Sequence, residues 1–374
     1  MKIGLVCPYD IFKNGGVQEC VKALRLEFNK LGHEAYIITP KPKKIDDLKN
    51  TDNIILVGES RDFKSPFHTT AQVSVSFDNT TIDEILQEYK FDILHFHEPW
   101  VPIVSRQILT RSNTVNIATF HAKLPETMMS KTIERVITPY TKSILKYIDS
   151  FTAVSDAAAD YVTSLTTKPV NIIPNGIDYK KFSNKSTIKK DEFTILYIGR
   201  LEKRKGLIYL LKAFEHLKTV LPDVKLVIAG DGPDKSKLEN YVDLNNIDNV
   251  KFLGFIDEDH KVELLQKTTI YCSPAIYGES FGIVLLEAMA AGAVTVAGNN
   301  PGYTSVLKGT GAISIVNVKD TVEFSRKLQL LMIDQDLRKL WINWAKNYVT
   351  QFNYQKIANN YIEIYKLAKR VRRK

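Results

Sequence analysis

Hydrophobic runs of strand length alternate with amphipathic helical stretches along all 374 residues of the chain. Short apolar runs that end at turn residues predict six strands in the first half, at residues 2–8, 34–40, 53–58, 92–99, 115–122 and 150–155. Between the first two, residues 16–33 place Val17, Val21 and Leu24 on one helical face, and Gly32 ends the helix. Such alternation predicts a parallel sheet with helices on both faces.

A second series of the same kind begins after residues 172–192, a stretch rich in lysine and turn residues that we interpret as a linker. Its predicted strands are residues 193–200, 225–233, 250–257, 269–275, 293–298 and 313–318. Because a single core usually stops growing at about 250 to 300 residues, the two series predict two doubly wound α/β domains, residues 1–178 and 179–351. Ligands of such sheets bind beyond the carboxyl ends of the strands, so we expect the site in the loops that follow them.

The stretch GESFGIVLLEAMAAG (278–292) places a glutamate inside an almost wholly apolar helical run. Such a helix is normally buried, and a buried carboxylate is costly unless a partner satisfies it. Glu287 could accept hydrogen bonds from a ribose diol, while Glu279, just before the helix, would face a sugar. The alternative is that Glu287 pairs with a structural lysine.

Basic residues gather in GRLEKRKGL (199–207), directly after the first strand of the second domain. Arg200, Arg204 and Lys205 lie beside a helix start near Gly206, and cations together with free N–H groups suit a diphosphate. The alternative interpretation is a basic turn that is exposed to solvent and binds no phosphate. Taken with the two glutamates, the cations predict a nucleotide-sugar site.

Three histidines at strand ends, His95, His97 and His121, offer a competing interpretation, because a His-x-His pair can bind zinc. No carboxylate pattern completes such a site, so we expect these side chains to form hydrogen bonds in a core or cleft. The acidic triplet at 257–259 resembles a metal-binding Asp-x-Asp by letters only, and we expect it to cap the helix that follows. The sequence therefore predicts no metal site.

Bulk composition is that of an ordinary soluble protein, with 44% apolar and 25% charged residues. The three cysteines, Cys7, Cys20 and Cys272, form no paired motif, and we expect them to be buried thiols. The first apolar run is too short for a signal peptide, and no run of about 18 apolar residues is present to span a membrane. We therefore expect a cytoplasmic protein.

The net charge of +9 is concentrated in the second half of the chain, where residues 181–374 carry 30 basic and 21 acidic side chains. Six of these positive charges lie in the last nine residues, KLAKRVRRK. Such a tail either suits an anionic membrane surface, which would place the protein at the inner face of the plasma membrane, or is a solvated, frayed terminus. Nucleic acid is not an expected partner, because no basic motif with interleaved aromatic residues is present.

Eight motifs, spread in order over nearly the whole chain, resemble those of retaining glycosyltransferases of family 4, which have the two-domain GT-B fold. They are CPYD…GGVQ, DILHFHEP, ATFH, AVSDAA, IPNGID, GRLEKRKG, FLGFIDE and GESFGIVLLEAMAAG. The last, a Glu-x7-Glu motif, is highly specific for this class, and within it the chain most resembles phosphatidylinositol mannosyltransferases. The resemblance implies two Rossmann-like domains and a final helix, about residues 352–374, that crosses back onto the N-terminal domain.

The resemblance also implies roles for individual residues. Those that would hold the nucleotide-sugar donor are Gly16, Arg200, Lys205, Glu258, Lys261, Glu279, Ser280, Phe281, Gly282, Ile283 and Glu287. Those on the acceptor side would be Tyr9, Gln18 and His121, the last beside the transferred sugar. The implied catalytic residues are His121, Glu279, Arg200 and Lys205. The cations and a helix N-terminus would meet the charge of the diphosphate in place of a metal ion, so no cofactor is expected.

The implied reaction moves a hexose from a nucleotide sugar to a lipid or cell-envelope glycan with retention of configuration, and mannose from GDP-mannose is favoured. The acceptor side departs from the family, because Trp100 stands where an asparagine is expected and ATFH is followed by AKLPETMMS. The region of the membrane-docking helix, TTIDEILQEYK, is more acidic than basic, which leaves the basic tail and residues 131–148 as candidate membrane contacts. Three alternatives remain open: a non-hydrolysing sugar-nucleotide epimerase, a metallohydrolase that uses the histidines, and a non-catalytic sugar-binding protein.

Overall fold

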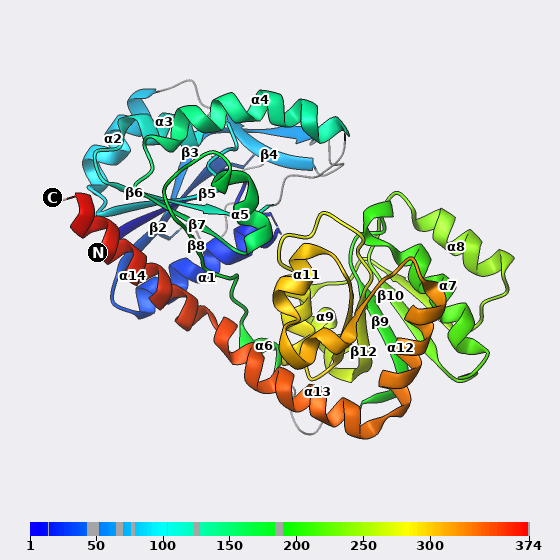
Figure 1. Cartoon of the computed structure of the whole chain (residues 1–374). Coiled ribbons are helices and arrows are strands. Elements are labelled where there is room, and N and C mark those ends of the chain that lie inside the picture. Colours follow the sequence, from blue (N-terminus) through cyan, green and yellow to red (C-terminus); the bar gives the residue numbers. More distant parts are fainter. Residues whose placement is uncertain are drawn as a thin grey trace. The chain divides into compact units, whose positions relative to one another are not determined.

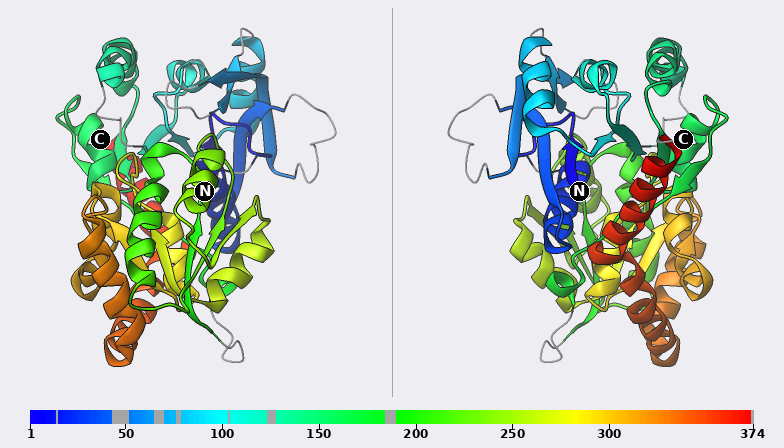
Figure 2. Two further views of the ribbon diagram at one scale, coloured as in Figure 1. Left: turned by 90° about the vertical axis from the view of Figure 1, so that its right-hand side faces the viewer. Right: turned by 90° about the vertical axis from the view of Figure 1, so that its left-hand side faces the viewer.

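The computed structural model describes residues 1–13, 15–42, 52–64, 70–75, 79–102, 104–122, 128–183 and 190–372. The chain divides into two compact units, one of Met1–Gly176 with Tyr354–Lys374 and one of Ile177–Asn353. These boundaries lie two residues from those expected from the sequence. Each unit is a sheet with helices on both faces (Figures 1 and 2). The predicted fold class, two doubly wound α/β domains, is confirmed.

The first unit contains an eight-stranded sheet in the order β4-β3-β2-β1-β5-β6-β7-β8. Its strands are β1 (Lys2–Val6), β2 (Glu34–Lys41), β3 (Ile54–Lys64), β4 (Thr70–Val75), β5 (Ile93–His97), β6 (Val115–Phe120), β7 (Ser150–Ala153) and β8 (Val170–Ile172). Neighbouring strands are parallel except for the antiparallel pair β3 and β4. All six predicted strands are present. The hydrophobic pattern does not predict β4 and β8, because β4 (TAQVSV) alternates apolar with polar residues and β8 (VNI) has only three residues.

The helices of this unit, within the described residues, are α1 (Gly16–Lys30), α2 (Asn79–Tyr89), α3 (Val104–Arg111), α4 (Met128–Leu145), α5 (Asp156–Thr163) and α14 (Tyr354–Arg372). The predicted apolar face of α1 is confirmed, since Val21, Leu24 and Phe28 are fully buried. Gly32 follows the helix with φ 79°, a conformation that glycine adopts at no steric cost.

Helix α14 packs into the core of the first unit. Its buried residues are Ile357, Ala358, Tyr361, Ile362, Tyr365 and Ala368. Lys369 Nζ lies 2.6 Å from Asp92 Oδ1, and Arg372 Nη1 lies 2.9 Å from Asp149 Oδ2. The predicted return of the last helix to the N-terminal domain is confirmed. The alternative of a frayed terminus is wrong for residues up to 372, because burial and ion pairs hold the helix; residues 373 and 374 lie outside the described residues.

The second unit contains a six-stranded, wholly parallel sheet in the order β11-β10-β9-β12-β13-β14. Its strands are β9 (Asp191–Ile198), β10 (Lys225–Ala229), β11 (Val250–Gly254), β12 (Thr268–Ser273), β13 (Val294–Gly298) and β14 (Ile315–Val316). Its α-helices are α6 (Tyr179–Phe182), α7 (Leu207–Lys218), α8 (Lys235–Leu244), α9 (Glu258–Lys267), α10 (Ile283–Ala290), α11 (Pro301–Val306), α12 (Thr321–Ile333) and α13 (Gln335–Tyr348). Short 3₁₀ turns lie at η2 (Lys203–Lys205), η3 (Gly309–Ser314) and η4 (Val349–Phe352). All six predicted strands of this half are present.

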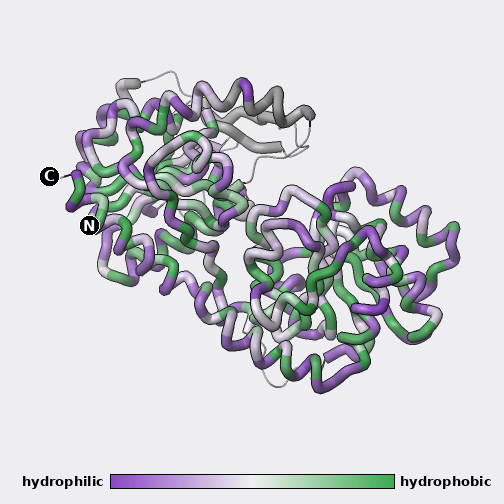
Figure 3. Tube along the Cα trace, viewed as in Figure 1, coloured by the Kyte–Doolittle hydropathy of each residue, from purple (hydrophilic) through white to green (hydrophobic). Residues whose placement is uncertain are grey.

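The strands consist mainly of hydrophobic residues, whereas outer helices such as α8 carry many hydrophilic ones (Figure 3). The three cysteines are free and buried, as predicted. Among the helices of the described ranges, none is both long and apolar enough to span a bilayer.

Candidate functional site

In the second unit, the loops after the central strands pack backbone against backbone at the carboxyl edge of the sheet. A Cβ on Gly206, which has φ 70°, would lie 2.1 Å from the carbonyl oxygen of Pro274. A Cβ on Gly230, which has φ 137°, would lie 1.9 Å from the carbonyl oxygen of Gly199. The loops after β9, β10 and β12 are therefore held together where only glycine fits.

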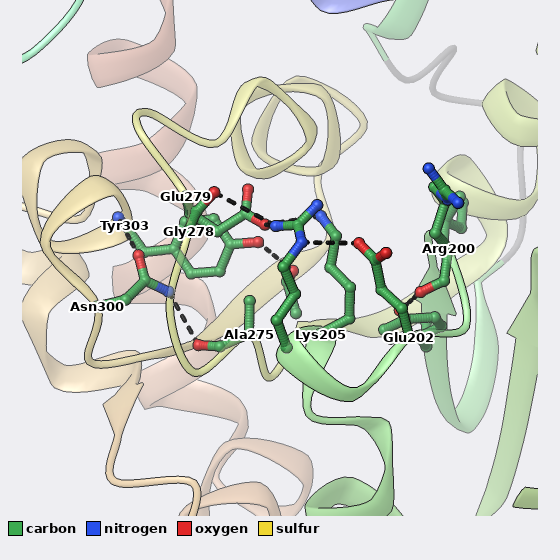
Figure 4. Close-up of polar contacts among 12 residues, drawn as sticks. Arg200, Glu202, Lys205, Ala275, Gly278, Glu279, Asn300 and Tyr303 are labelled. Atoms are coloured by element: carbon green, nitrogen blue, oxygen red, sulfur yellow. Dashed lines mark hydrogen bonds and ion pairs between the residues drawn. The ribbon is translucent and has the colours of Figure 1, made fainter. Parts of the chain in front are cut away.

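Lys205 and Glu279 form the centre of this edge (Figure 4). Lys205 Nζ and Arg204 Nη1 lie 2.7 and 2.9 Å from the same Glu279 oxygen, Oε1. Arg204 Nε also lies 2.7 Å from Glu202 Oε1. The Lys205 and Glu279 side chains are only 19% and 13% exposed, so the ion pairs are largely shielded from solvent. This fixes the Glu279 carboxylate between two cations, beside the start of α10.

Arg200 is close in sequence but does not join this cluster. Its side chain is exposed and points away from Glu279 and Lys205 (Figure 4). Its carbonyl oxygen accepts a hydrogen bond of 2.9 Å from Tyr197. Arg204 instead contacts Glu279. The motif contains four cations, Arg200, Lys203, Arg204 and Lys205, and of these the structure places Arg204 and Lys205 against Glu279.

The loop before α10 contains three of the predicted donor contacts, Ser280, Phe281 and Gly282, and the fourth, Ile283, is the first residue of the helix. The helix begins at Ile283, and not at Ser280 as predicted, because Gly282 adopts φ 99°, outside the helical region. The Phe281 side chain is 5% exposed and packs edge-on against Phe352, with ring centroids 6.0 Å apart. Only the main chain of Phe281 can therefore face a ligand. The first N–H groups of α10 have no partner within the helix and suit an anion.

Helix α11 also supports this loop, a contact that the sequence pattern did not predict. A Cβ on Gly302 would lie 2.2 Å from the carbonyl oxygen of Glu279. Asn300 Nδ2 donates to the Ala275 carbonyl oxygen at 2.9 Å, and Asn300 Oδ1 accepts from the Tyr303 N–H at 3.0 Å (Figure 4). The available signal is the segment NNPGY (299–303), a helix start with an asparagine cap, a proline and a glycine.

Glu287 is paired with Lys261, whose Nζ lies 3.0 Å from Glu287 Oε1. Lys261 also lies 2.9 Å from Glu258, which in turn lies 3.1 Å from Lys181. Burial raises the pKa of Glu287, and Lys261 opposes this rise. The lysine partner that the alternative predicted for Glu287 is therefore present. The structure brings Glu258, Lys261 and Glu287 together through these ion pairs.

The acidic triplet caps α9, as predicted. Asp257 is the N-cap and accepts a hydrogen bond of 2.8 Å from the N–H of His260. Within the described ranges, no group of three or more His, Cys, Asp or Glu residues is placed to hold a metal ion.

In the first unit, His97 is the last residue of β5 and His121 directly follows β6, whereas His95 lies in the middle of β5 and not at its end as predicted. His95 Nδ1 lies 2.7 Å from Tyr365 Oη, and His95 Nε2 lies 2.6 Å from Thr119 Oγ1. His97 Nδ1 lies 2.8 Å from His121 Nε2. Burial lowers the pKa of His95 to about 3 and that of His121 to about 4, so both imidazoles are neutral near pH 7. The predicted hydrogen-bonding role of the histidines is confirmed.

Tyr9 and Gln18 lie near the carboxyl end of β1, the neighbour of β5. The Tyr9 carbonyl oxygen accepts from Thr39 at 2.8 Å, and burial raises the pKa of the Tyr9 hydroxyl, with a smaller contribution from Glu98. Gln18 Nε2 lies 3.5 Å from the Asp10 carbonyl oxygen. Gly16, the first residue of α1, is exposed. Residues 123–127, where the acceptor-side sequence departs from the family, lie outside the described residues.

Glu98, which the sequence pattern does not predict as a site residue, is buried directly after β5. Burial raises its pKa to about 8, although main-chain hydrogen bonds from His121 and Ala122 oppose the rise. The feature of the sequence that could have identified Glu98 is its position, because it is a charged residue that directly follows a wholly buried strand.

Two Rossmann-like units with a last helix that returns to the first are the architecture of GT-B glycosyltransferases. A glycosyltransferase from Rickettsia africae has this fold, with a TM-score of 0.76, 19% identity and coverage of 98% of both chains. Sucrose-phosphate synthase from Thermosynechococcus elongatus gives a TM-score of 0.77 at 20% identity, again over 98% of both chains.

Two family models cover most of the chain: Glycosyltransferase Family 4 matches residues 14–181, and Glycosyl transferases group 1 matches residues 178–348. The phosphatidyl-myo-inositol mannosyltransferase of Mycolicibacterium smegmatis is 30% identical over 372 residues, which are 98% of this chain and 93% of that relative. The enzyme of the same name from Mycobacterium leprae is 28% identical over 98% and 96%. The chain therefore belongs to the family 4 glycosyltransferases and is a hexosyltransferase. This membership gives no support to the epimerase, metallohydrolase and sugar-binding alternatives.

Proposed function

We propose that the protein transfers mannose from GDP-mannose to an inositol-containing phospholipid, with retention of configuration and without a metal ion. The observation that carries the proposal is the Glu279 carboxylate, held between Lys205 and Arg204 beside the start of α10. Relatives named phosphatidyl-myo-inositol mannosyltransferase support the choice of sugar and acceptor. A lipid-linked or cell-envelope glycan is the broader acceptor class.

The second unit would bind the donor. Glu279 would accept hydrogen bonds from hydroxyls of the transferred sugar, and Glu287 would accept them from the ribose diol. Lys205 and the N–H groups of residues 280–283 would meet the diphosphate, whose charge grows as the glycosidic bond breaks. Arg200, at the same edge, would swing onto the diphosphate from its exposed position, and Glu258 and Lys261 would lie near the base.

The first unit would bind the acceptor. The neutral imidazole of His121 would form a hydrogen bond with the transferred sugar, while Tyr9 and Gln18 would contact the acceptor. The loop at Gly16 would approach the diphosphate. The acceptor hydroxyl would attack from the face of the leaving group, and a phosphate oxygen of that group would take its proton. Trp100, which packs against Phe120 and Tyr161 with ring centroids 6.4 and 5.4 Å away, would shape the acceptor side in this chain.

The test begins with a thermal-shift screen of GDP-, UDP- and ADP-sugars, followed by incubation of the preferred donor with phosphatidylinositol and with lipid-free inositol. We expect GDP-mannose to raise the melting temperature and a mannosylated lipid to form in EDTA. If no nucleotide sugar binds, or if the donor is epimerised without an acceptor, the proposal is wrong.

A membrane surface is the second partner to test, because the acceptor would be a lipid. The cations Lys369 and Arg372 are engaged with Asp92 and Asp149, whereas Arg370 is exposed. In the 131–148 segment, Ile144 and Ile148 are buried, which removes them as lipid contacts; the side chains of Lys131 and Ile133 lie outside the described residues.

Sedimentation with anionic liposomes, with and without residues 366–374, tests the tail. A charge-reversed variant, Arg370→Glu, tests it without removing the packed part of α14. Its matched control is Lys339→Glu, an exposed lysine on α13. We expect the truncated protein and Arg370→Glu to sediment less with the liposomes, and Lys339→Glu to sediment like the wild type. Equal binding of all forms contradicts a role for the tail.

A further inference from the structure

Glu98 has an unusual conformation for a residue with a side chain. It directly follows β5 and has φ 49°, a value that non-glycine residues seldom adopt and that is held only when surrounding contacts require it. Its own N–H donates to the Thr119 carbonyl oxygen at 2.9 Å, and the residue is 1% exposed. The chain therefore turns sharply so that this carboxylate faces the end of β6.

One oxygen of Glu98 holds the main chain at that end. Glu98 Oε1 accepts the N–H of His121 at 2.6 Å and the N–H of Ala122 at 2.7 Å. Both residues lie directly beyond Phe120, the last residue of β6. A carboxyl oxygen that accepts two main-chain N–H groups leaves little freedom to the backbone that carries the His121 side chain.

The His121 ring is restrained as well. Its Nε2 lies 2.8 Å from His97 Nδ1. Because both imidazoles are neutral, a single proton lies between Nδ1 of His97 and Nε2 of His121, which restricts the tautomers that the pair can adopt. Backbone and ring of His121 are thus held by separate groups, Glu98 and His97.

We propose that Glu98 is a positioning residue for glycosyl transfer, which holds the main chain at residues 121 and 122 and thereby aims the His121 imidazole at the transferred sugar. The inference rests on the role of His121 in the proposed function. Glu98 itself would not touch the substrate, since it is buried beneath the residues that it holds. Its effect should therefore appear in kcat for transfer, while binding of the donor to the second unit stays unchanged.

Three substitutions separate positioning from folding. Glu98→Gln keeps an oxygen that accepts both N–H groups, Glu98→Asp is one methylene shorter and cannot reach both, and Glu98→Ala removes the acceptor. We expect kcat to fall at least 20-fold for Asp and Ala with the donor KM within twofold, and Gln to keep at least a third of the activity. Glu88→Ala, at an exposed position of α2, is the matched control and should behave as the wild type.

A second readout needs no substrate. In protein labelled with ¹⁵N-histidine, the His121 ring signals, assigned by their loss in His121→Asn, should shift in Glu98→Ala and stay in place in Glu98→Gln. Unmoved signals in Glu98→Ala, an unchanged kcat, or an equal loss in the Gln variant would each overturn the proposal. If no donor supports transfer, the proposed function fails while the ring signals still test the positioning.

Discussion

Lys205 Nζ lies 2.7 Å from Glu279 Oε1, although the two side chains come from loops that follow different strands, β9 and β12. The pair forms because these strands are neighbours in a parallel sheet, so that their carboxyl ends meet at one edge. In the proposed function, Lys205 would contact the diphosphate at that edge, and Glu279 would contact the sugar hydroxyls.

Replacement of Lys205 by alanine tests the cation. Loss of one charge that stabilises the leaving diphosphate should lower kcat/KM for the donor by about 100-fold. Lys203→Ala is the matched control, because Lys203 is exposed on the same 3₁₀ turn, and it should stay within about twofold of the wild type. Steady-state kinetics with varied donor measure both. Equal losses in the two variants would show a general charge effect in place of a specific contact.

Glu279→Ala tests the carboxylate. Because Glu279 would contact the sugar and not the nucleotide, transfer should be abolished while the nucleoside diphosphate still binds. Removal of the carboxylate also frees Lys205 and Arg204, so binding of the diphosphate should, if anything, become tighter. Isothermal titration with GDP and a single-turnover assay separate the two effects. A collapse of GDP affinity would mean that the assigned role is wrong.

Glu287→Gln tests the ribose contact. The amide keeps the shape but loses the charge that accepts hydrogen bonds strongly, so GDP should bind about tenfold more weakly, which corresponds to about 1.4 kcal/mol. Glu263→Gln, at an exposed position of α9, is the control. An unchanged affinity for GDP in Glu287→Gln would favour the purely structural pairing with Lys261.

Phe352→Ala tests whether the aromatic contact with Phe281 supports the donor loop. The cavity should lower the free energy of unfolding by roughly 3 kcal/mol and also raise the donor KM, because the main chain at 280–283 loses its support. Phe324→Ala is the matched control, since Phe324 is fully buried in α12. This control should lower the free energy of unfolding by a similar amount and leave the donor KM unchanged. If both variants raise the donor KM equally, the effect is one of global stability.

The buried His95 predicts sensitivity to acid. Burial lowers its pKa from 6.5 to about 3. Between these two pH values the imidazole is therefore protonated in the unfolded chain and neutral in the folded one. Its contribution to stability is therefore present above pH 6.5 and is lost as the pH falls toward 3, by up to about 1.4 kcal/mol per pH unit. Denaturant unfolding between pH 7 and pH 4.5 measures this slope. His95→Gln should flatten it, whereas the exposed His216→Gln should not.

The alternation of apolar runs was sufficient to predict twelve strands, because a strand buried on both faces must be apolar along its whole length. The pattern did not predict β4 and β8, since β4 alternates apolar with polar residues and β8 has only three residues. The same reasoning showed that Glu287 needs a partner, because a helix apolar on every side has no solvent face. It did not name Lys261, which comes from another helix.

Local sequence by itself therefore determined the two α/β series, the caps such as Asp257 and the motif that indicates the family. The tertiary structure alone decided which polar groups meet: Arg204 and not Arg200 at Glu279, Lys261 at Glu287, and Glu98 beneath His121. The physical reason is the separation along the sequence over which each effect acts. Hydrophobic periodicity and turn chemistry act between near neighbours, whereas these pairs join residues 23 to 75 positions apart, whose distance depends on strand order and loop packing.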